Sequence, residues 1–206
     1  MKIVIIPGVG YQKDNSKENC LGRNIQKEIK CDFEIFNWDH TILKYAMKGI
    51  MEMYECKEIS YSDLRKFIAE VIFDFEFAIK YGGMVDIPEA DYYIGHSAGS
   101  LFSMSQSKPS AMMGSPVALV KYLPKISNEE SYFVNSILDS DKPILNIVNK
   151  YDVIAYPMQE PWVKNVYFRE SIFNPISYFP LTAHLCYWKN KFVAKEIVKH
   201  INEVMK

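Results

Sequence analysis

The sequence predicts an α/β fold with a mostly parallel sheet of about six strands and helices on both faces. Short apolar, β-branched runs alternate along the chain with segments whose apolar residues recur at helical spacing, the order that a parallel sheet requires. The run 143–149 (PILNIVN) is apolar enough for a strand buried on both sides. No repeat, low-complexity tract or linker-like segment divides the 206 residues, so we expect a single domain over residues 1–206.

The elements follow in a regular order. Strands are expected at 2–7, 31–37, 91–95, 110–114, 143–149 and 164–169. Helices are expected at 16–30, 41–56, 62–80, 98–107 and 185–204. Candidate cap insertions lie at 41–61 and 116–140. The first insertion carries an apolar stripe at helical spacing, which is more typical of a packed core face than of a pocket.

The first strand runs into a glycine-containing turn. Residues 2–6 are followed by Pro7 and then by Gly8 and Gly10. Glycines at a strand end let the backbone approach a substrate closely, so the Val9 amide is a candidate donor to an oxyanion. A plain strand-ending turn is the alternative. A dinucleotide-binding motif is not indicated, because the third glycine of that motif is absent.

The segment 95–99 (GHSAG) follows the apolar run 91–94 and precedes a segment that can continue as a helix. A serine with glycine two residues to either side fits a tight strand-to-helix turn, because larger side chains there would clash with the helix and the adjacent strand. Such an elbow presents Ser97 as a nucleophile, and the Ala98 amide is the second candidate oxyanion donor. An ordinary Gly/Ser turn is the alternative.

A serine hydroxyl becomes a good nucleophile only when a base accepts its proton. The chain has four histidines. His40 precedes the serine and His96 adjoins it, which leaves His184 and His200. His200 lies in an amphipathic run that predicts a solvated helix face, whereas His184 lies in a predicted loop, 180–185, before the last helix. We therefore expect His184 to be the base.

The base needs a carboxylate that orients its ring. Seven carboxylates lie between Ser97 and His184, and Asp152 lies in the loop at the carboxyl end of the apolar, β-branched run 143–149. Catalytic groups of open α/β sheets gather at the carboxyl ends of the strands, so Asp152 is the expected acid. A loop aspartate that binds local backbone amides is the alternative.

The turn 7–10 (PGVG), the segment 95–99, Asp152 and His184 resemble the α/β-hydrolase superfamily in its small serine esterase and lipase forms, over nearly the whole chain. The order serine, acid, histidine is that family's order. Two features depart from it: Pro7 stands where many members have histidine, and the family's leading antiparallel strands are not expected, because the first strand begins at residue 2.

The resemblance implies a single-domain α/β-hydrolase fold and a serine hydrolase that cleaves a carboxylic ester or thioester through an acyl-enzyme. An amidase or acyltransferase with the same triad, or a non-catalytic protein that binds a ligand or partner, is the alternative. Tyr11, Trp38 and His96 are expected to contact the substrate, a small-molecule ester. If the insertion 41–61 folds over the site, its methionines and Trp38 form a candidate acyl pocket.

Composition limits the other possibilities. The net charge is −1 and no cluster of Lys or Arg stands out, so no nucleic-acid partner is expected. The apolar run near the start is too short for a signal peptide or a spanning helix, so we expect no membrane insertion and a cytoplasmic location. The four cysteines have no Cys-x-x-Cys spacing and are expected to be reduced. No metal or organic cofactor is expected.

Overall fold

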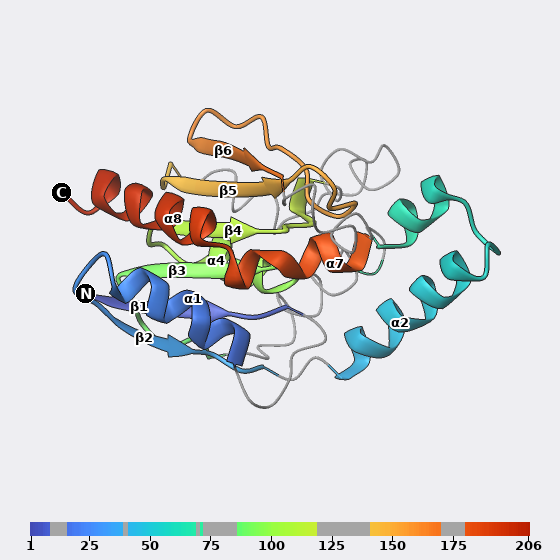
Figure 1. The fold of residues 1–206 in the computed structure, drawn as a ribbon, viewed down its shortest axis with the longest axis horizontal. Coiled ribbons are helices and arrows are strands. Elements are labelled where there is room, and N and C mark those ends of the chain that lie inside the picture. Colours follow the sequence, from blue (N-terminus) through green and yellow to red (C-terminus); the bar gives the residue numbers. More distant parts are fainter. Residues whose placement is uncertain (9–15, 39–40, 69–70, 72–85, 119–140, 170–179) are drawn as a thin grey trace.

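The structure is a computed structural model that describes residues 1–8, 16–38, 41–68, 71, 86–118, 141–169 and 180–206. In these parts of the chain six strands form one sheet in the order β2-β1-β3-β4-β5-β6, and every neighbouring pair is parallel (Figure 1). The strands are β1 (Lys2–Ile6), β2 (Asp32–Ile35), β3 (Tyr92–His96), β4 (Ser110–Met113), β5 (Ile144–Asn149) and β6 (Val163–Phe168). The predicted parallel sheet of about six strands is confirmed.

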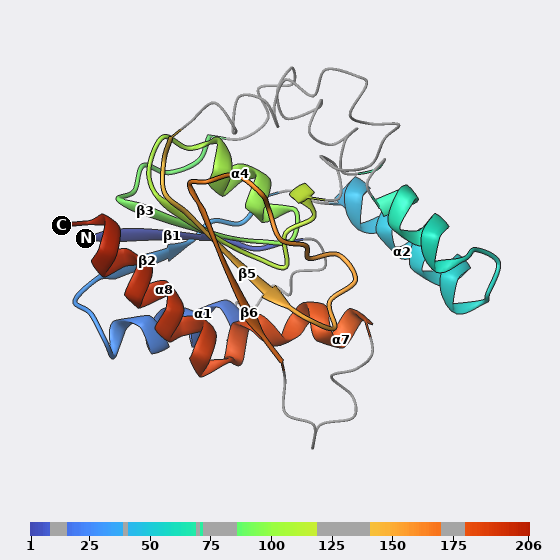
Figure 2. The same ribbon diagram turned by 90° about the horizontal axis from the view of Figure 1, so that it is seen from above.

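Helices lie on both faces of this sheet, as predicted. They are α1 (Ser16–Gln26), α2 (Thr41–Glu55), α4 (Gly99–Ser105), α7 (Pro180–Leu185), the 3-10 helix η2 (Cys186–Lys189) and α8 (Lys191–Val204), and a further helix spans 61–68. Figure 2 shows α4 on one face and α1, α7 and α8 on the other.

A hydrophobic core lies on each face of the sheet, because side chains alternate between the two faces along each strand. Ile3 and Ile5 of β1 pack with residues of α1 and α8, whereas Val4 and Ile6 pack with residues of α4. Successive side chains of a strand point to opposite faces, so a strand covered on both faces needs apolar residues at every position. The sequence KIVII satisfies this requirement after its first residue.

The order of the strands reverses next to β1. The chain passes from β1 to β2 on one side, and β3 then pairs with β1 on its other side, with Ile6 opposite Gly95. In open α/β sheets, ligands bind where the strand order reverses, in the crevice outside the carboxyl ends of the strands. Pro7 and Gly8 after β1 and the turn after β3 both lie at that crevice.

The end of the chain differs from the prediction of one helix over 185–204. Two helical segments, η2 and α8, replace it after Leu185, and the segment 180–185, expected as a loop, is α7. The break before α8 has a local cause, because the side chain of Asn190 accepts a hydrogen bond from the Phe192 amide and caps the new helix. The other predicted elements whose ends are described lie within a few residues of the observed ones, and α1 is shorter than predicted; the end of the predicted helix 62–80 lies outside the described residues.

The first cap insertion is helical, and α2 projects from the end of the sheet (Figures 1 and 2). Ile50, Met51 and Tyr54 are half-buried and pack against the α4-side core, whereas Met53 is exposed. The side chain of Met47 and most of the second insertion, 116–140, lie outside the described residues. The acyl pocket stays a prediction.

None of the described helices has both the length and the apolar character needed to cross a membrane.

Candidate active site

Ser97 occupies a strained turn between β3 and α4. Its φ is 52°, in the left-handed region that costs a non-glycine residue about 1–2 kcal/mol. The neighbouring glycines make the turn possible, because a Cβ at Gly95 would lie 2.5 Å from the Gly99 carbonyl oxygen. A Cβ at Gly99 would clash with the carbonyl oxygen of Ile6. This is the geometry expected of a nucleophile elbow.

The loop after β1 passes directly beside the serine. A Cβ built on Gly8 would lie 2.5 Å from Ser97 Cβ and 3.2 Å from Ser97 Oγ, so only a glycine backbone fits this close approach. The Trp38 indole N–H donates a hydrogen bond to the Pro7 carbonyl oxygen at 2.7 Å and fixes the start of the loop. Trp38 is 8% exposed, and its ring packs against Phe102. Its predicted role in contacting substrate stays a prediction.

The two predicted oxyanion donors differ in what the structure describes. The Ala98 amide lies at the start of α4 and donates no hydrogen bond to any other described residue. Buried amides are nearly always paired, so an amide beside Ser97 that has no partner among the described residues is suited to receive an oxyanion. Val9 and the predicted substrate contact Tyr11 lie outside the described residues.

His184 and Asp152 form a buried hydrogen-bonded pair. His184 Nδ1 lies 2.9 Å from Asp152 Oδ2, and the Asp152 side chain is fully buried. The Ile154 amide donates to Asp152 Oδ1 at 2.9 Å. A carboxylate only accepts, so His184 Nδ1 carries the hydrogen and, in the neutral ring, Nε2 is free to accept one.

The environment of Asp152 favours its charged form. Burial, the largest single cause, raises the pKa of this carboxyl group, and the attraction and hydrogen bond of His184 are the main causes that lower it. Hydrogen bonds from Ile154 and Tyr187 add to that effect, and the pKa lies below its ordinary value. Asp152 is therefore ionised at neutral pH and stabilises positive charge on the imidazole.

His96 connects the elbow to the segment that carries His184. Its Nε2 donates to the His184 carbonyl oxygen at 2.7 Å, and the two imidazole rings lie 4.7 Å apart. Burial is the main cause that lowers the pKa of His96 to about 3, so this ring is neutral at physiological pH. Its described contacts are with the histidine segment, and its predicted contact with substrate stays a prediction.

The described residues contain no hydrogen bond between Ser97 Oγ and His184. In the absence of substrate, catalytic hydrogen bonds are often long or poorly aligned, and they tighten in the complex. The structure therefore brings the serine, the histidine and the acid to one edge of the sheet, with the pair of His184 and Asp152 joined and the serine adjacent to His96.

Besides Tyr187, which is described below, sequence reasoning missed two residues at this edge. Asn149, the last residue of β5, donates through Nδ2 to the Ala183 carbonyl oxygen at 3.0 Å and accepts from the Tyr151 amide at 3.2 Å. It thus ties the loop of Asp152 to the helix of His184. A polar residue at the end of an apolar strand is the sequence signal for it.

Gly114, after β4, is the second missed residue. Its φ is +60°, and a Cβ there would lie 3.0 Å from both Asp152 Oδ2 and His184 Nδ1. Any other residue here would have a strained backbone, and its Cβ would crowd the side chains of Asp152 and His184. The signal was a glycine at the end of a buried strand.

His200 lies far from this edge. Its Nδ1 is 2.6 Å from the hydroxyl of Tyr92, which begins β3, whereas Ser97 follows the other end of that strand. The prediction of a solvated position is wrong, because His200 is 3% exposed. Burial lowers its pKa to about 4.

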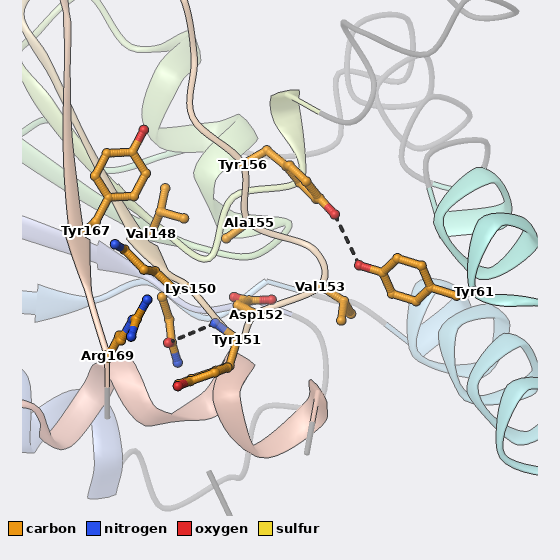
Figure 3. A pocket seen from close by; sticks show the side chains of 11 residues that line it. Tyr61, Val148, Lys150, Tyr151, Asp152, Val153, Ala155, Tyr156, Tyr167 and Arg169 are labelled. Carbon is orange, nitrogen blue, oxygen red and sulfur yellow. Dashed lines mark hydrogen bonds between the residues drawn. The ribbon is translucent and has the colours of Figure 1, made fainter. Parts of the chain in front are cut away.

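A pocket of about 480 Å³ flanks the loop of Asp152. Figure 3 shows Lys150 and Arg169 on one side of it and Tyr61 and Tyr156 on the other. The hydroxyls of Tyr61 and Tyr156 lie 3.2 Å apart and link the helix 61–68 to this loop. Ser97 does not line this pocket.

No group of three or more metal-ligating side chains is present among the described residues.

No protein-family model matches the chain, and no curated protein matches it. Among solved structures, Est1E from Butyrivibrio proteoclasticus is similar at 13% identity, over 98% of this chain and 88% of that one, with a TM-score of 0.48. The described chain itself has the parallel sheet, the strand order and the strained serine between strand and helix. These features establish an α/β fold with a six-stranded parallel sheet, and the α/β-hydrolase resemblance stays an expectation from the sequence.

Proposed function

We propose that this protein is a serine hydrolase that cleaves carboxylic esters or thioesters. The observation that supports this most is the buried pair of Asp152 and His184 at the sheet edge where Ser97 occupies its left-handed turn. A strained residue and a buried ionised carboxylate both cost stability, so their occurrence at one edge favours a functional reason over a structural one.

In the proposed reaction, Ser97 Oγ attacks the acyl carbon while His184 Nε2 takes its proton. The imidazolium then gives that proton to the leaving alcohol or thiol, and the carbon–heteroatom bond of the substrate breaks. Water attacks the acyl-enzyme with His184 again as base, releasing the acid and restoring Ser97. Asp152 holds the ring in the Nδ1–H tautomer and stabilises the imidazolium.

The oxyanion of each tetrahedral intermediate needs donors aimed at it. We assign one to the Ala98 amide, which donates to no other described residue. The second is proposed to come from the turn after Gly8, with Val9 as the candidate. The approach of Gly8 to Ser97 Oγ supports this assignment, because it brings the loop within reach of a bound acyl group.

The test is hydrolysis of p-nitrophenyl esters of increasing acyl length, beside a thioester and an anilide. Wild-type protein is expected to turn over at least one acyl derivative, and Ser97→Ala to lower its kcat to near the background rate, a loss of roughly 10⁵-fold or more in a full triad. Ser105→Ala is the matched control, because its hydroxyl bonds only within α4 and to Gln106.

The same assay with His184→Ala and His200→Ala tests the base. We expect the first variant to lose about as much activity as Ser97→Ala and the second to keep wild-type activity. Equal loss in both variants, or full activity in Ser97→Ala, would contradict the assignment. A folded wild-type protein that turns over none of the substrates would favour the non-catalytic alternative.

A further inference from the structure

Tyr187 contacts the acid of the proposed triad from a position that sequence reasoning did not indicate. It lies in η2, three residues after His184, and is fully buried. Its hydroxyl donates to Asp152 Oδ2 at 2.8 Å, the same oxygen that accepts from His184 Nδ1. The hydroxyl oxygen also accepts from the Asn149 amide at 2.9 Å.

The two hydrogen bonds of the Tyr187 hydroxyl can have only one direction, from the Asn149 amide to Tyr187 and from Tyr187 to Asp152. The Asn149 backbone N–H can only donate, so it occupies the tyrosine oxygen as an acceptor and leaves the single O–H proton for the carboxylate. Burial raises the pKa of Tyr187 well above its ordinary value, and the charge of Asp152 adds to the effect. Tyr187 therefore keeps its proton and remains a donor at neutral pH.

The phenol ring is held in place on two sides. Its centroid lies 5.3 Å from the ring of Phe168 and 5.7 Å from that of His96, both in edge-to-face contact. Edge-to-face packing at these distances is favourable and restricts the ring. The hydroxyl thus cannot turn from Asp152 without disturbing the packing of β6 and of the elbow strand.

Few other titratable groups face the pair in the described part of the chain. His96 faces the pair from β3 and is neutral. Cys186, in η2, raises the pKa of Tyr187. Tyr156, in the loop that follows Asp152, is protonated, because burial is the main cause that raises its pKa to about 12. The positive charge of Lys17 in α1 helps to lower the pKa of His96. Unlike these groups, Tyr187 donates a hydrogen bond to the Asp152 carboxylate.

We propose that Tyr187 is a positioning residue that shares the Asp152 oxygen with His184, and so fixes the carboxylate in one orientation and sets the pH at which the pair takes up a proton. The kinetic part of this inference rests on the proposed hydrolase function. The phenol competes with His184 for the same negative oxygen. Removing it has two effects of the same sign: Asp152 becomes easier to protonate, and its undivided charge favours the protonated imidazole.

The experiment is Tyr187→Phe with Tyr92→Phe as the matched control. Tyr92 is another fully buried tyrosine of this sheet, with its hydroxyl bonded to His200, away from Ser97. We expect Tyr187→Phe to move the acid limb of kcat/KM to higher pH by about one unit, the shift that a lost charge-assisted hydrogen bond produces. Its kcat falls by roughly tenfold at neutral pH with KM unchanged. Tyr92→Phe is expected to lose stability and keep the wild-type pH profile.

A second perturbation has the opposite sign and keeps the packing. Difluorotyrosine incorporated at position 187 is a stronger hydrogen-bond donor of nearly the same shape. It is expected to move the acid limb to lower pH. It also keeps the inference testable if Tyr187→Phe does not fold.

The readout that separates the two proposals is the NMR titration of the His184 ring in wild type and in both Tyr187 variants. This titration is expected to shift with the same signs, whether or not the protein hydrolyses esters. An inactive wild type with shifted titrations would overturn the hydrolase function alone. Unshifted titrations in both Tyr187 variants, with loss of stability equal to that of Tyr92→Phe, would overturn the inference.

Discussion

The buried His200 predicts a specific loss of stability in acid. Its folded pKa of about 4 lies below the value of about 6.5 for an unfolded histidine. Burial is the main cause, and the charge of Lys164 adds to it. Between these two pH values the unfolded chain binds a proton that the folded chain does not, so the free energy of unfolding falls as the pH falls.

The size of the effect follows from the shift. Each pH unit in this window costs about 1.4 kcal/mol, so lowering the pH from about 7 to about 4.5 removes roughly 2 to 3 kcal/mol through this one side chain. His200→Asn removes the titration and keeps a polar atom near the Nδ1 position that meets Tyr92. The variant is expected to lose that much less stability than wild type over the same interval.

The assay is urea unfolding of both proteins at the two pH values and one ionic strength. The difference between the two pH-dependent losses isolates His200, because the remaining titratable groups are the same in both proteins. Equal losses in wild type and His200→Asn would show that this histidine takes up a proton in the folded state, and would refute the reasoning from burial.

Three further predictions concern the site. Gly114→Ala combines strain at a φ of +60° with a Cβ 3.0 Å from the pair, so we expect a loss of about 1–2 kcal/mol in urea unfolding and a clear loss of kcat; wild-type kcat would contradict it. Asp152→Asn removes the acceptor that fixes the His184 tautomer, so kcat should fall by roughly 10⁴-fold, less than in Ser97→Ala; an unchanged kcat would exclude Asp152 as the acid. Trp38→Phe removes the N–H that holds the Pro7 carbonyl, which costs about 1 kcal/mol and lowers kcat by loosening the loop; unchanged stability would count against that hydrogen bond.

Local patterns were enough to predict the sheet. The four central strands β1, β3, β4 and β5 are buried over almost their whole length and are mostly apolar, over a length that a helix would exceed, whereas the edge strands β2 and β6 are only partly buried. The single last helix over 185–204 was predicted wrongly, because its apolar periodicity was followed without weighing Asn190 as a helix cap. Pro180, at the first position of α7, was likewise a signal for a helix start.

His200 shows how a sequence signal was misread. It lies seven residues after Val193 and three after Ile197, which is the spacing of one helix face, and both of those residues are buried. The charged neighbours of His200 suggested a solvated face, but the apolar periodicity of α8 already placed it in the core.

The residues of the candidate site likewise fall into those that a local sequence pattern indicates and those that it does not. Ser97 and Asp152 could be predicted as candidates because each stands at a strand end with a local pattern around it. Tyr187 and Asn149 were not found, because their partners lie 35 and 34 residues away in the chain. Such contacts are visible only when the topology is known.

Covalent labelling with a fluorophosphonate probe, mapped by mass spectrometry, tests the central claim most directly. The account predicts one phosphonyl adduct on Ser97 in the wild-type protein, no adduct in Ser97→Ala, and strongly slowed labelling in His184→Ala. Labelling in His200→Ala is expected at the wild-type rate. A folded wild-type protein that takes up no probe, or an adduct on another serine that forms equally fast in Ser97→Ala, would contradict it.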